Sequence, residues 1–422
     1  MISGVRKFLK VVVLLVLAGV ALMMIRGMRA SKMEKLFVAF RGEGGEVQMR
    51  LVDPVNGAVI KQGSFKESDL DGNLLYPVLL GAGGTSPIFY DSRNSRVLMV
   101  THRYNGGEDD YSIAPADGTA VYTLPIDGSG GLEEVYYGEG VVASRVVLDE
   151  LNGALLLFES GENNGSGKVR KLSLSNWGDR VVAEFQFEFD SEKRLGSLYD
   201  EPYLPFRKNL ESAYFGEVQR VSYDDFDLIL SDDAKSLFIP AKVSMTGRPG
   251  FPVSSLNEEL VLVRIELESG LVSFINVVRG DSIHGSSEGL SGDGKKMAFL
   301  EGWGSYEVIY TDLDGGGLSK LGVRDNLSNI NAWLSRGGNK MALVTEEGIE
   351  MLDMKGGMLG KLPGSYIYSW SGSGDWMLVK VGHDYKSPGV DEIVNTKTGS
   401  SAPVKFKQPN VDYDYLSVSW VK

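Results

Sequence analysis

Cysteine is absent from this sequence of 422 residues. Its absence excludes disulfides, a thiolate nucleophile, iron–sulfur clusters and cysteine-based zinc sites, so the fold must be stabilised by packing and strand pairing. Histidine is nearly as scarce, with three residues. We expect no metal site and no cofactor, and the sequence identifies no catalytic residue.

Basic side chains are too few to indicate a nucleic-acid partner. Lys and Arg number 43 against 56 Asp and Glu, a formal net charge of −13, whereas a phosphate backbone requires a basic face. Proline is also scarce, with 14 residues against 53 glycines. The glycines recur beside Asp, Asn and Ser, which is typical of hairpin turns and favours an all-β fold over disorder.

Long apolar runs are missing except over residues 11–25, which basic residues flank on both sides. As a helix this run would cover about 22 Å, less than the roughly 30 Å of a hydrocarbon core, and flanking Lys and Arg side chains can extend outward to close the difference. We expect residues 1–30 to form an N-terminal hydrophobic helix that anchors the chain in a membrane. A cleaved signal segment and a buried helix remain open.

A lone apolar segment at the N-terminus most simply directs export. We therefore expect the rest of the chain to lie outside the cytoplasm, in the periplasm or at the cell surface, held by a single-pass anchor. If the segment is cleaved, the protein is secreted. Basic residues on both sides of the run leave its orientation poorly determined.

Residues 290–318, LSGDGKKMAFLEGWGSYEVIYTDLDGGGL, form the clearest structural unit. They predict three short strands separated by two turns, Ser291-Gly292-Asp293-Gly294 and Asp314-Gly315. The same opening turn and following apolar strand recur through the chain, and each is followed by a second turn. The seven openings begin at Ser31, Asp91, Asp149, Ser231, Ser291, Ser335 and Ser371, and the second turns are at Asn56-Gly57, Asp127-Gly128, Asn176-Trp177-Gly178, Ser269-Gly270, Asp314-Gly315, Lys355-Gly356 and Thr398-Gly399.

Small sheets that repeat at unequal spacing predict a β-propeller, with seven blades favoured and six to eight possible. Trp333 and Trp370 each close a short inner strand, and Trp420 occupies the same kind of position in the last strand, residues 415–421. No outer strands of a blade follow this inner strand in the sequence, and no inner strand precedes residues 36–40. We expect the C-terminal strand to join the first blade and close the ring, which makes residues 31–422 one domain.

The pattern W-S-x-D-G-K-x-hydrophobic, followed by I-Y-x-x-D-x-D-G, resembles the repeat of TolB-type propellers, which also occurs in the propeller domains of prolyl oligopeptidase relatives. The match is strongest over residues 290–318 and fair over residues 332–362 and 369–403. The resemblance implies a fold and not an activity, because the chain has no room for the hydrolase domain. A nearby G-x-S-x-G match at residues 285–289 precedes a turn and a strand, whereas a nucleophile elbow requires a helix.

The strand order implied by the resemblance places the loops after each second strand and the loops between blades on one rim. All three histidines, including His284, then map to that rim. Aromatic and charged residues gather on the same loops, and we expect these to bind a ligand: His102, Arg103, Tyr104, Trp303, Tyr306, His383, Asp384 and Tyr385. The alternative is that the aromatic rings only pack against one another.

Residues 191–226 form an aromatic-rich excursion from the repeat. It is either a partner-binding segment or a long crossover packed on the ring, and we favour the crossover. For the whole chain we expect a membrane-tethered module outside the cytoplasm that binds a protein, peptide or glycan. The alternatives are a propeller enzyme of the hydrolase, lyase or cyclase kind with its site at the ring mouth, and a structural element of an envelope complex.

Overall fold

The computed structural model describes the greater part of the chain after the N-terminal segment. The described residues are 34–42, 45–70, 88–104, 116–161, 165–187, 194–197, 218–222, 227–245, 258–280, 283–284, 289–302, 304–314, 317–382, 389–404 and 414–421. The expected hydrophobic helix over residues 1–30 lies outside them. Among the described residues, no helix is long and apolar enough to cross a membrane.

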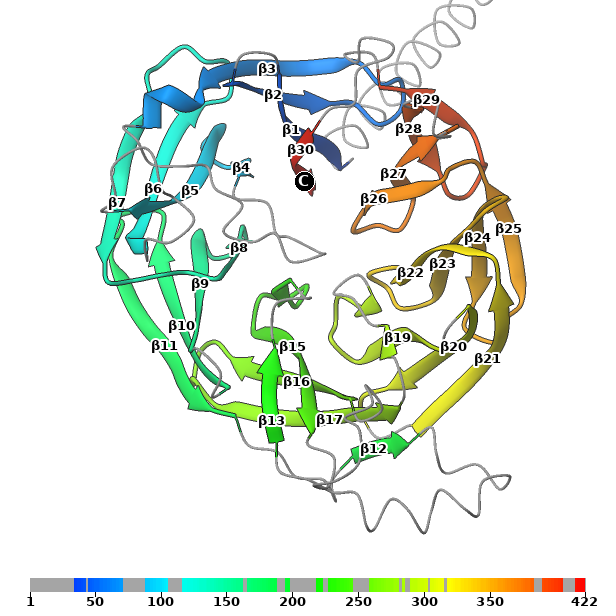
Figure 1. Ribbon diagram of the computed structural model, residues 1–422. Coiled ribbons are helices and arrows are strands. Elements are labelled where there is room, and N and C mark those ends of the chain that lie inside the picture. Colours follow the sequence, from blue (N-terminus) through cyan, green and yellow to red (C-terminus); the bar gives the residue numbers. More distant parts are fainter. Residues whose placement is uncertain are drawn as a thin grey trace, which may run out of the picture.

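The described strands form seven sheets arranged radially around a central axis, which confirms the predicted seven-bladed propeller (Figure 1). Strands of the first three blades are given from the axis outward. Blade one contains β30 (Asp414–Val421), β1 (Lys35–Arg41), β2 (Glu46–Val52) and β3 (Val59–Lys66). Blade two contains β4 (Ile88–Asp91), β5 (Arg96–Tyr104), β6 (Ala116–Pro125) and β7 (Glu133–Glu139). Blade three contains β8 (Arg145–Asp149), β9 (Ala154–Ser160), β10 (Ser166–Ser173) and β11 (Asp179–Gln186).

Blade four departs from the four-stranded pattern because six strands contribute to its sheet. It contains β14 (Ile229–Leu230), β15 (Ser236–Met245), β16 (Glu258–Glu266) and β17 (Val272–Gly280), with β12 (Arg194–Ser197) outside β17 and β13 (Val218–Ser222) beside β15.

Blade five contains β18 (Ile283–His284), β19 (Lys296–Glu301), β20 (Ser305–Asp312) and β21 (Gly317–Asp325). Blade six contains β22 (Leu327–Leu334), β23 (Lys340–Thr345), β24 (Gly348–Asp353) and β25 (Met358–Leu362), and blade seven contains β26 (Tyr366–Trp370), β27 (Trp376–Val381), β28 (Val390–Asn395) and β29 (Ser401–Pro403).

The second strand of each blade supplies much of the core. Along β1 the residues from Leu36 to Phe40 are all almost completely buried. A strand is buried on both faces when its sheet is packed between two others, and it then has a continuous apolar run instead of alternation. One set of these side chains, including Phe37, packs toward blade two, and the other set, including Phe40, packs toward blade seven.

The opening turns lie between the first and second strands of the blades, as predicted, with Ser31 outside the described residues. In blade five the Ser291 hydroxyl accepts a hydrogen bond from the Lys296 amide at 3.0 Å, and Gly294 has a φ of 67°. In blade two Asp91 replaces the serine, and its carboxylate accepts a hydrogen bond from the Asn94 side chain at 2.7 Å. The serine and aspartate openings are therefore two hydrogen-bonded forms of one turn.

The second turns lie between the third and fourth strands. The opening turns and the second turns consequently share one rim, which we call the turn rim. The connections between second and third strands and between successive blades share the other, which we call the loop rim. This arrangement agrees with the two rims expected from the sequence.

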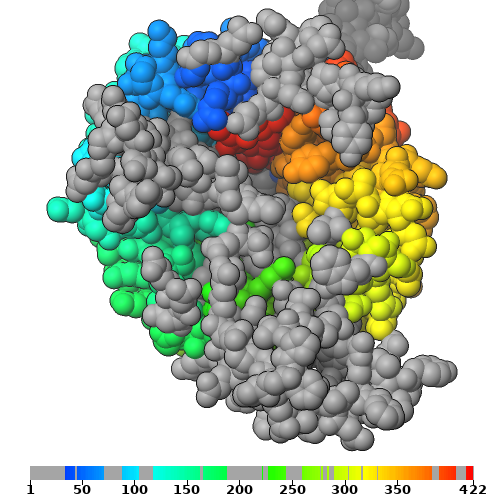
Figure 2. Space-filling view, in the orientation of Figure 1, coloured from blue at the N-terminus to red at the C-terminus, as the bar shows by residue number. Residues whose placement is uncertain are grey.

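The last strand closes the ring by pairing with β1 in antiparallel register. Leu36 lies directly opposite Trp420, as expected. Figure 2 shows the red C-terminal strand between the blue of blade one and the orange of blade seven. Glu34, which is buried, also accepts a hydrogen bond from the Ser373 amide of blade seven at 3.0 Å. The closure therefore joins blade one to blade seven at the turn rim as well.

Contacts between opening turns join blades four, five and six at the turn rim. The Asp232 amide of blade four donates to the Gly292 carbonyl of blade five at 2.7 Å, and the Gly292 amide donates to the Arg336 carbonyl of blade six at 2.7 Å. The Arg336 guanidinium then reaches back to the Asp232 carboxylate at 2.7 Å. Since this ion pair joins blades that are not neighbours, the three turns lie close together.

The described parts of the aromatic-rich excursion pair with blade four. β12 runs parallel to β17 at its outer edge, and β13 runs antiparallel to β15. These pairings extend the sheet of blade four at two of its edges. Residues 198–217, which carry many of its aromatic side chains, lie outside the described residues.

Candidate functional site at the seam between blades one and seven

Four of the eight residues expected to bind a ligand are described, and they lie on two blades. Described parts of the chain place His102 and Arg103 on β5 of blade two and Tyr306 on β20 of blade five. Tyr104 is the last residue of β5. Four of the predicted residues lie outside the described residues: Trp303, His383, Asp384 and Tyr385.

His102 was expected in a loop, but β5 extends further than predicted and its imidazole is buried. Its Nε2 lies 3.0 Å from the Ala143 carbonyl oxygen, in the connection to blade three. Burial lowers the pKa of His102 below its usual 6.5, and the hydrogen bond to Ala143 opposes this only in part. The neutral ring therefore donates from Nε2 to Ala143 and links β5 to the connection that leads into blade three.

Arg103 also makes contacts within its own blade. Its guanidinium lies 2.6 Å from a Glu134 carboxylate oxygen and stacks over the Tyr137 ring at 4.1 Å. The Tyr122 hydroxyl donates to the same carboxylate at 2.9 Å. This set joins β5, β6 and β7 in the outer part of blade two.

Tyr306 contacts His284, the other described histidine. Their rings meet edge to face with centroids 5.7 Å apart, and His284 Nε2 lies 3.2 Å from the Gly302 carbonyl oxygen. Desolvation lowers the pKa of His284, with the nearby Lys242 as a smaller cause in the same direction. The structure therefore brings together Tyr306 and His284, but it does not bring Tyr306 close to His102 or Arg103.

A different group of side chains converges where the ring closes, and we call it the seam cluster. It consists of Phe40, Tyr366, Tyr368, Asp391 and Tyr415. Phe40 and Tyr415 belong to blade one, and the other three belong to blade seven. They lie at the loop-rim ends of β1, β30, β26 and β28, because each of these strands begins or ends at that rim.

Asp391 is the centre of the seam cluster. Its side chain is completely buried, and its two carboxylate oxygens accept hydrogen bonds from Tyr415 at 2.5 Å and Tyr368 at 3.4 Å. A buried carboxylate requires such donors because it has lost its hydration. Asp391 thus fixes the hydroxyl ends of two tyrosines, one from each side of the seam.

The aromatic rings of the cluster contact one another in sequence across the seam. Tyr366 meets Tyr368 at 5.1 Å between centroids, Tyr368 meets Tyr415 at 4.8 Å, and Tyr415 meets Phe40 at 6.3 Å. All three contacts are edge to face, the geometry that aromatic quadrupoles favour. Phe40 is buried, whereas Tyr366 is 44% exposed, so the row of rings extends from the core to the surface.

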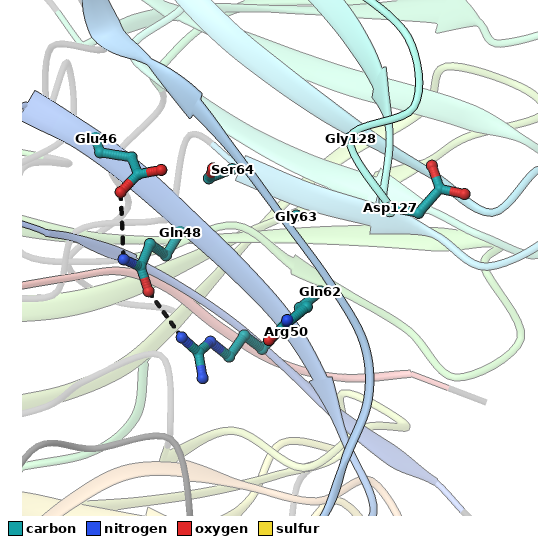
Figure 3. Close-up of a pocket in the computed structure, with 8 residues that line it drawn as sticks. All are labelled: Glu46, Gln48, Arg50, Gln62, Gly63, Ser64, Asp127 and Gly128. Carbon is teal, nitrogen blue, oxygen red and sulfur yellow. Dashed lines mark hydrogen bonds between the residues drawn. The ribbon is translucent and has the colours of Figure 1, made fainter.

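A polar groove adjoins the cluster on the flank of blade one (Figure 3). Arg50 on β2 stacks over Phe40 with its guanidinium carbon 5.6 Å from the ring centroid, and it donates to Gln48 at 2.8 Å. Gln48 in turn donates to Glu46 at 3.4 Å. The row Glu46–Gln48–Arg50 is thereby in contact with Phe40, the buried ring of the seam cluster.

Within the described residues, no group of three or more His, Cys, Asp or Glu side chains is placed to hold a metal ion. The seam cluster has one carboxylate, and tyrosine hydroxyls already occupy both of its oxygens. Its chemistry fits recognition by ring faces and hydroxyls better than binding of a cation.

The seam cluster was not predicted as a site, although the sequence contained part of the signal. The predicted closure placed residues 415–421 beside residues 36–40, which implied that Tyr415 lies near Phe40. Tyr366 and Tyr368 precede Trp370 at every second position of the inner strand of blade seven. This strand was expected to border the same seam. The role of Asp391 could not be foreseen, because its burial depends on the packing of two blades that are distant in sequence.

Comparisons with known proteins match the fold and nothing narrower. No family model matches the sequence, and a search of curated proteins also finds no match. Among solved structures, a putative 6-phosphogluconolactonase from Bacteroides fragilis is 12% identical, with 92% of this chain and 98% of that chain covered and a TM-score of 0.48. An oligogalacturonate lyase in complex with manganese is 13% identical, with 87% and 84% covered and a TM-score of 0.46.

A prolyl endopeptidase structure is 12% identical over 88% of this chain and 49% of that chain, with a TM-score of 0.46. These similarities are too low to carry an argument about activity or ligand. The seven-bladed fold rests on the strand pairing of this chain itself, and the comparisons do not establish a TolB-type affiliation.

Proposed function

We propose that this protein is a binding module that presents the loop rim of a rigid propeller to a protein, peptide or glycan partner. The observation that carries the proposal is the seam cluster, where a partly exposed tyrosine is connected through two further rings to a buried, hydrogen-bonded carboxylate. Rigid aromatic groups with fixed polar ends recognise partners at a low cost in conformational entropy.

The difference between the two rims supports this proposal. The turn rim is made of short hydrogen-bonded turns joined from blade to blade, as in the Asp232–Arg336 ion pair. The longer connections leave from the loop rim: residues 105–115 join β5 to β6, and residues 382–389 join β27 to β28. Binding residues commonly lie on loops that a rigid scaffold positions.

The cellular compartment in which the partner is found follows from the proposed localisation of the protein. We propose that the N-terminal apolar segment is a membrane anchor and that the propeller lies outside the cytoplasm, in the periplasm or at the cell surface. The basis is the run over residues 11–25 with its flanking basic residues. The repeat motif further leads us to propose a place within the TolB-type group of propellers.

Photo-crosslinking tests the proposed binding rim. A photoreactive amino acid replaces Tyr366 at the loop rim in one variant and Leu151 at the turn rim in another, in the full-length protein within its native membranes. The two side chains are 44% and 57% exposed, so accessibility alone favours the Leu151 position. We expect a discrete adduct of fixed mass from position 366 and none from position 151.

The same experiment distinguishes the alternatives. Adducts of equal yield from both positions would contradict a site confined to the loop rim, and adducts only from position 151 would place the partner at the turn rim. If position 366 captures a small molecule that is recovered cleaved, the enzyme alternative replaces the binding module. Protease protection of the propeller in intact cells would contradict the proposed address.

A further inference from the structure

The groove on the flank of blade one has a composition that the binding rim does not explain. Its volume is about 360 Å³, at the low end of the roughly 300–1,000 Å³ that is usual for small-molecule sites. Eight residues line it, and none has an apolar side chain: Glu46, Gln48, Arg50, Gln62, Gly63, Ser64, Asp127 and Gly128. Most ligand sites have an apolar lining, so this groove is suited to an unusually polar ligand.

Four side chains of the groove, three of them with planar ends, share one face of the blade-one sheet. Arg50 on β2 lies opposite Gln62 on β3, and Gln48 lies opposite Ser64, so these four side chains share one face. Figure 3 shows Asp127 on the other side of β3, with its carboxylate directed away from the row. Guanidinium, amide and carboxylate groups each offer two coplanar hydrogen-bonding atoms, which match the paired hydroxyls of a polyol.

The row is fixed before any ligand arrives. Arg50 is held by the Phe40 ring beneath it and by its hydrogen bond to Gln48, which is bonded to Glu46. On the other side of β3 the strand is fixed at Gly63, where a Cβ atom would lie 2.4 Å from the Ile126 carbonyl oxygen of blade two. Such pre-organisation lowers the entropic cost of binding a polar ligand.

The charges of the row select against ionic ligands. Glu46 and Arg50 carry opposite charges and are joined through Gln48, so neither a cation nor an anion finds an uncompensated partner along the row. A protein partner needs a far larger contact, on the order of 800 Å² on each side. A neutral, hydroxyl-rich ligand of small size satisfies all of these conditions.

We propose that this groove is a subsite for a neutral oligosaccharide, recognised through the planar side chains of Gln48, Arg50 and Gln62. The inference does not depend on what binds at the loop rim, because the groove lies on the outer strands β2 and β3 and not at the channel mouth. It adds a ligand class and a second contact surface to the proposed binding module.

The test uses the full-length protein in detergent and an array of immobilised oligosaccharides, both neutral and acidic. Neutral oligomers of glucose, mannose, galactose and N-acetylglucosamine are compared with uronate and sialylated ones, and the best neutral binder is then titrated by calorimetry. We expect at least one neutral class to bind. Gln62→Ala and Arg50→Lys should each weaken it at least tenfold, because the first removes an amide and the second removes the planar fork while it keeps the charge.

Blade three provides matched controls. Gln186 is an exposed glutamine on β11, and Arg170 lies on β10, so both lie on the corresponding strands of another blade. Gln186→Ala and Arg170→Lys should leave the affinity unchanged, and melting curves verify that all four variants fold. Absence of binding to every neutral oligosaccharide, stronger binding to the acidic ones, or equal losses in the blade-three controls would each overturn the proposal.

Failure of this proposal and failure of the proposed binding rim are separable. Gln62→Ala should not change the adduct formed from position 366. Saccharide binding without an adduct at position 366 would support the groove and contradict the rim, and the reverse result would do the opposite.

Discussion

The hydroxyl of Tyr415 donates to the buried carboxylate of Asp391 at 2.5 Å, across the seam at which the first and last parts of the chain meet. The two residues lie 24 positions apart in sequence, yet they belong to different blades. Tyr415 is on the last strand, which completes blade one, and Asp391 is on β28 of blade seven. The proposed binding site is therefore assembled by ring closure itself.

Tyr415→Phe should destabilise the protein by about 1–3 kcal/mol, because it removes a hydrogen-bond donor from a buried carboxylate. The free energy of unfolding from urea titration measures this loss. Tyr137→Phe is the matched control, since that ring stacks under Arg103 and no hydrogen bond of its hydroxyl is seen among the described residues. We expect a change of less than about 0.5 kcal/mol there, and equal losses in the two variants would contradict the role of Asp391.

Glu34→Ala should weaken the junction of blades one and seven at the turn rim. One carboxylate oxygen of Glu34 accepts a hydrogen bond from the Ser373 amide. The other lies so close to Gly372 that a Cβ atom at that position would be 2.7 Å from it. Loss of a buried acceptor costs about 1–3 kcal/mol. Glu347→Ala is the comparison, because its side chain is 83% exposed and pairs with Lys361 at the surface, where such pairs contribute roughly 0–1 kcal/mol.

Gly294→Ala and Gly382→Ala separate backbone strain from steric clash. Both glycines have positive φ, 67° and 73°. A Cβ at Gly294 would lie 1.9 Å from the Phe238 ring of blade four, whereas nothing lies within 4 Å of one at Gly382. Thermal unfolding should show about 1–2 kcal/mol of loss for Gly382→Ala, from strain alone, and a clearly larger loss for Gly294→Ala. Similar losses would mean that the opening turn of blade five does not pack against Phe238.

Protonation of His102 should lower the stability of the folded protein as the pH falls below neutrality. The pKa of the buried imidazole is lowered from 6.5, so between the folded and unfolded pKa values the unfolded state binds the additional proton. The contribution of neutral His102 to the free energy of unfolding is fully present above about pH 6.5. It falls as the pH decreases toward the pKa of the folded state, and it is constant below that pKa. Melting temperatures at pH 7.5 and 5.5 should differ more for the wild type than for His102→Gln, and an equal difference would contradict a neutral buried ring.

The repeat could be predicted from the sequence because its signals are local. Gly294 and Asp91 mark their turns through residues a few positions away, and these turns define the blades regardless of distant packing. The pairing that closes the ring could also be predicted. The inner strand that contains Trp420 had no outer strands after it in the sequence, and residues 36–40 had no inner strand before them.

The candidate site could not be predicted to the same extent. His102 was expected in a loop, because nothing nearby in sequence shows that β5 continues to Tyr104 and buries the imidazole against Ala143 of the next connection. Asp391 could not be singled out because its partners are tyrosines from two blades. Arg50 stands in an ordinary alternating strand, and its packing over Phe40 and its hydrogen bond to Gln48 distinguish it from a solvated arginine.

Ring closure can be measured directly because the chain contains no cysteine. Lys35 lies opposite Val421 in the β1–β30 pair, and directly opposed strand residues have Cα atoms about 4.5–5.5 Å apart, within the range that a disulfide spans. Lys35→Cys with Val421→Cys should therefore oxidise to an intramolecular disulfide that raises the melting temperature. Lys35→Cys with Ser419→Cys places the thiols at a diagonal separation of about 7–8 Å and should remain reduced under the same conditions. A disulfide in the first pair and free thiols in the second are the predicted result, and free thiols in both would contradict the closure on which the seam depends.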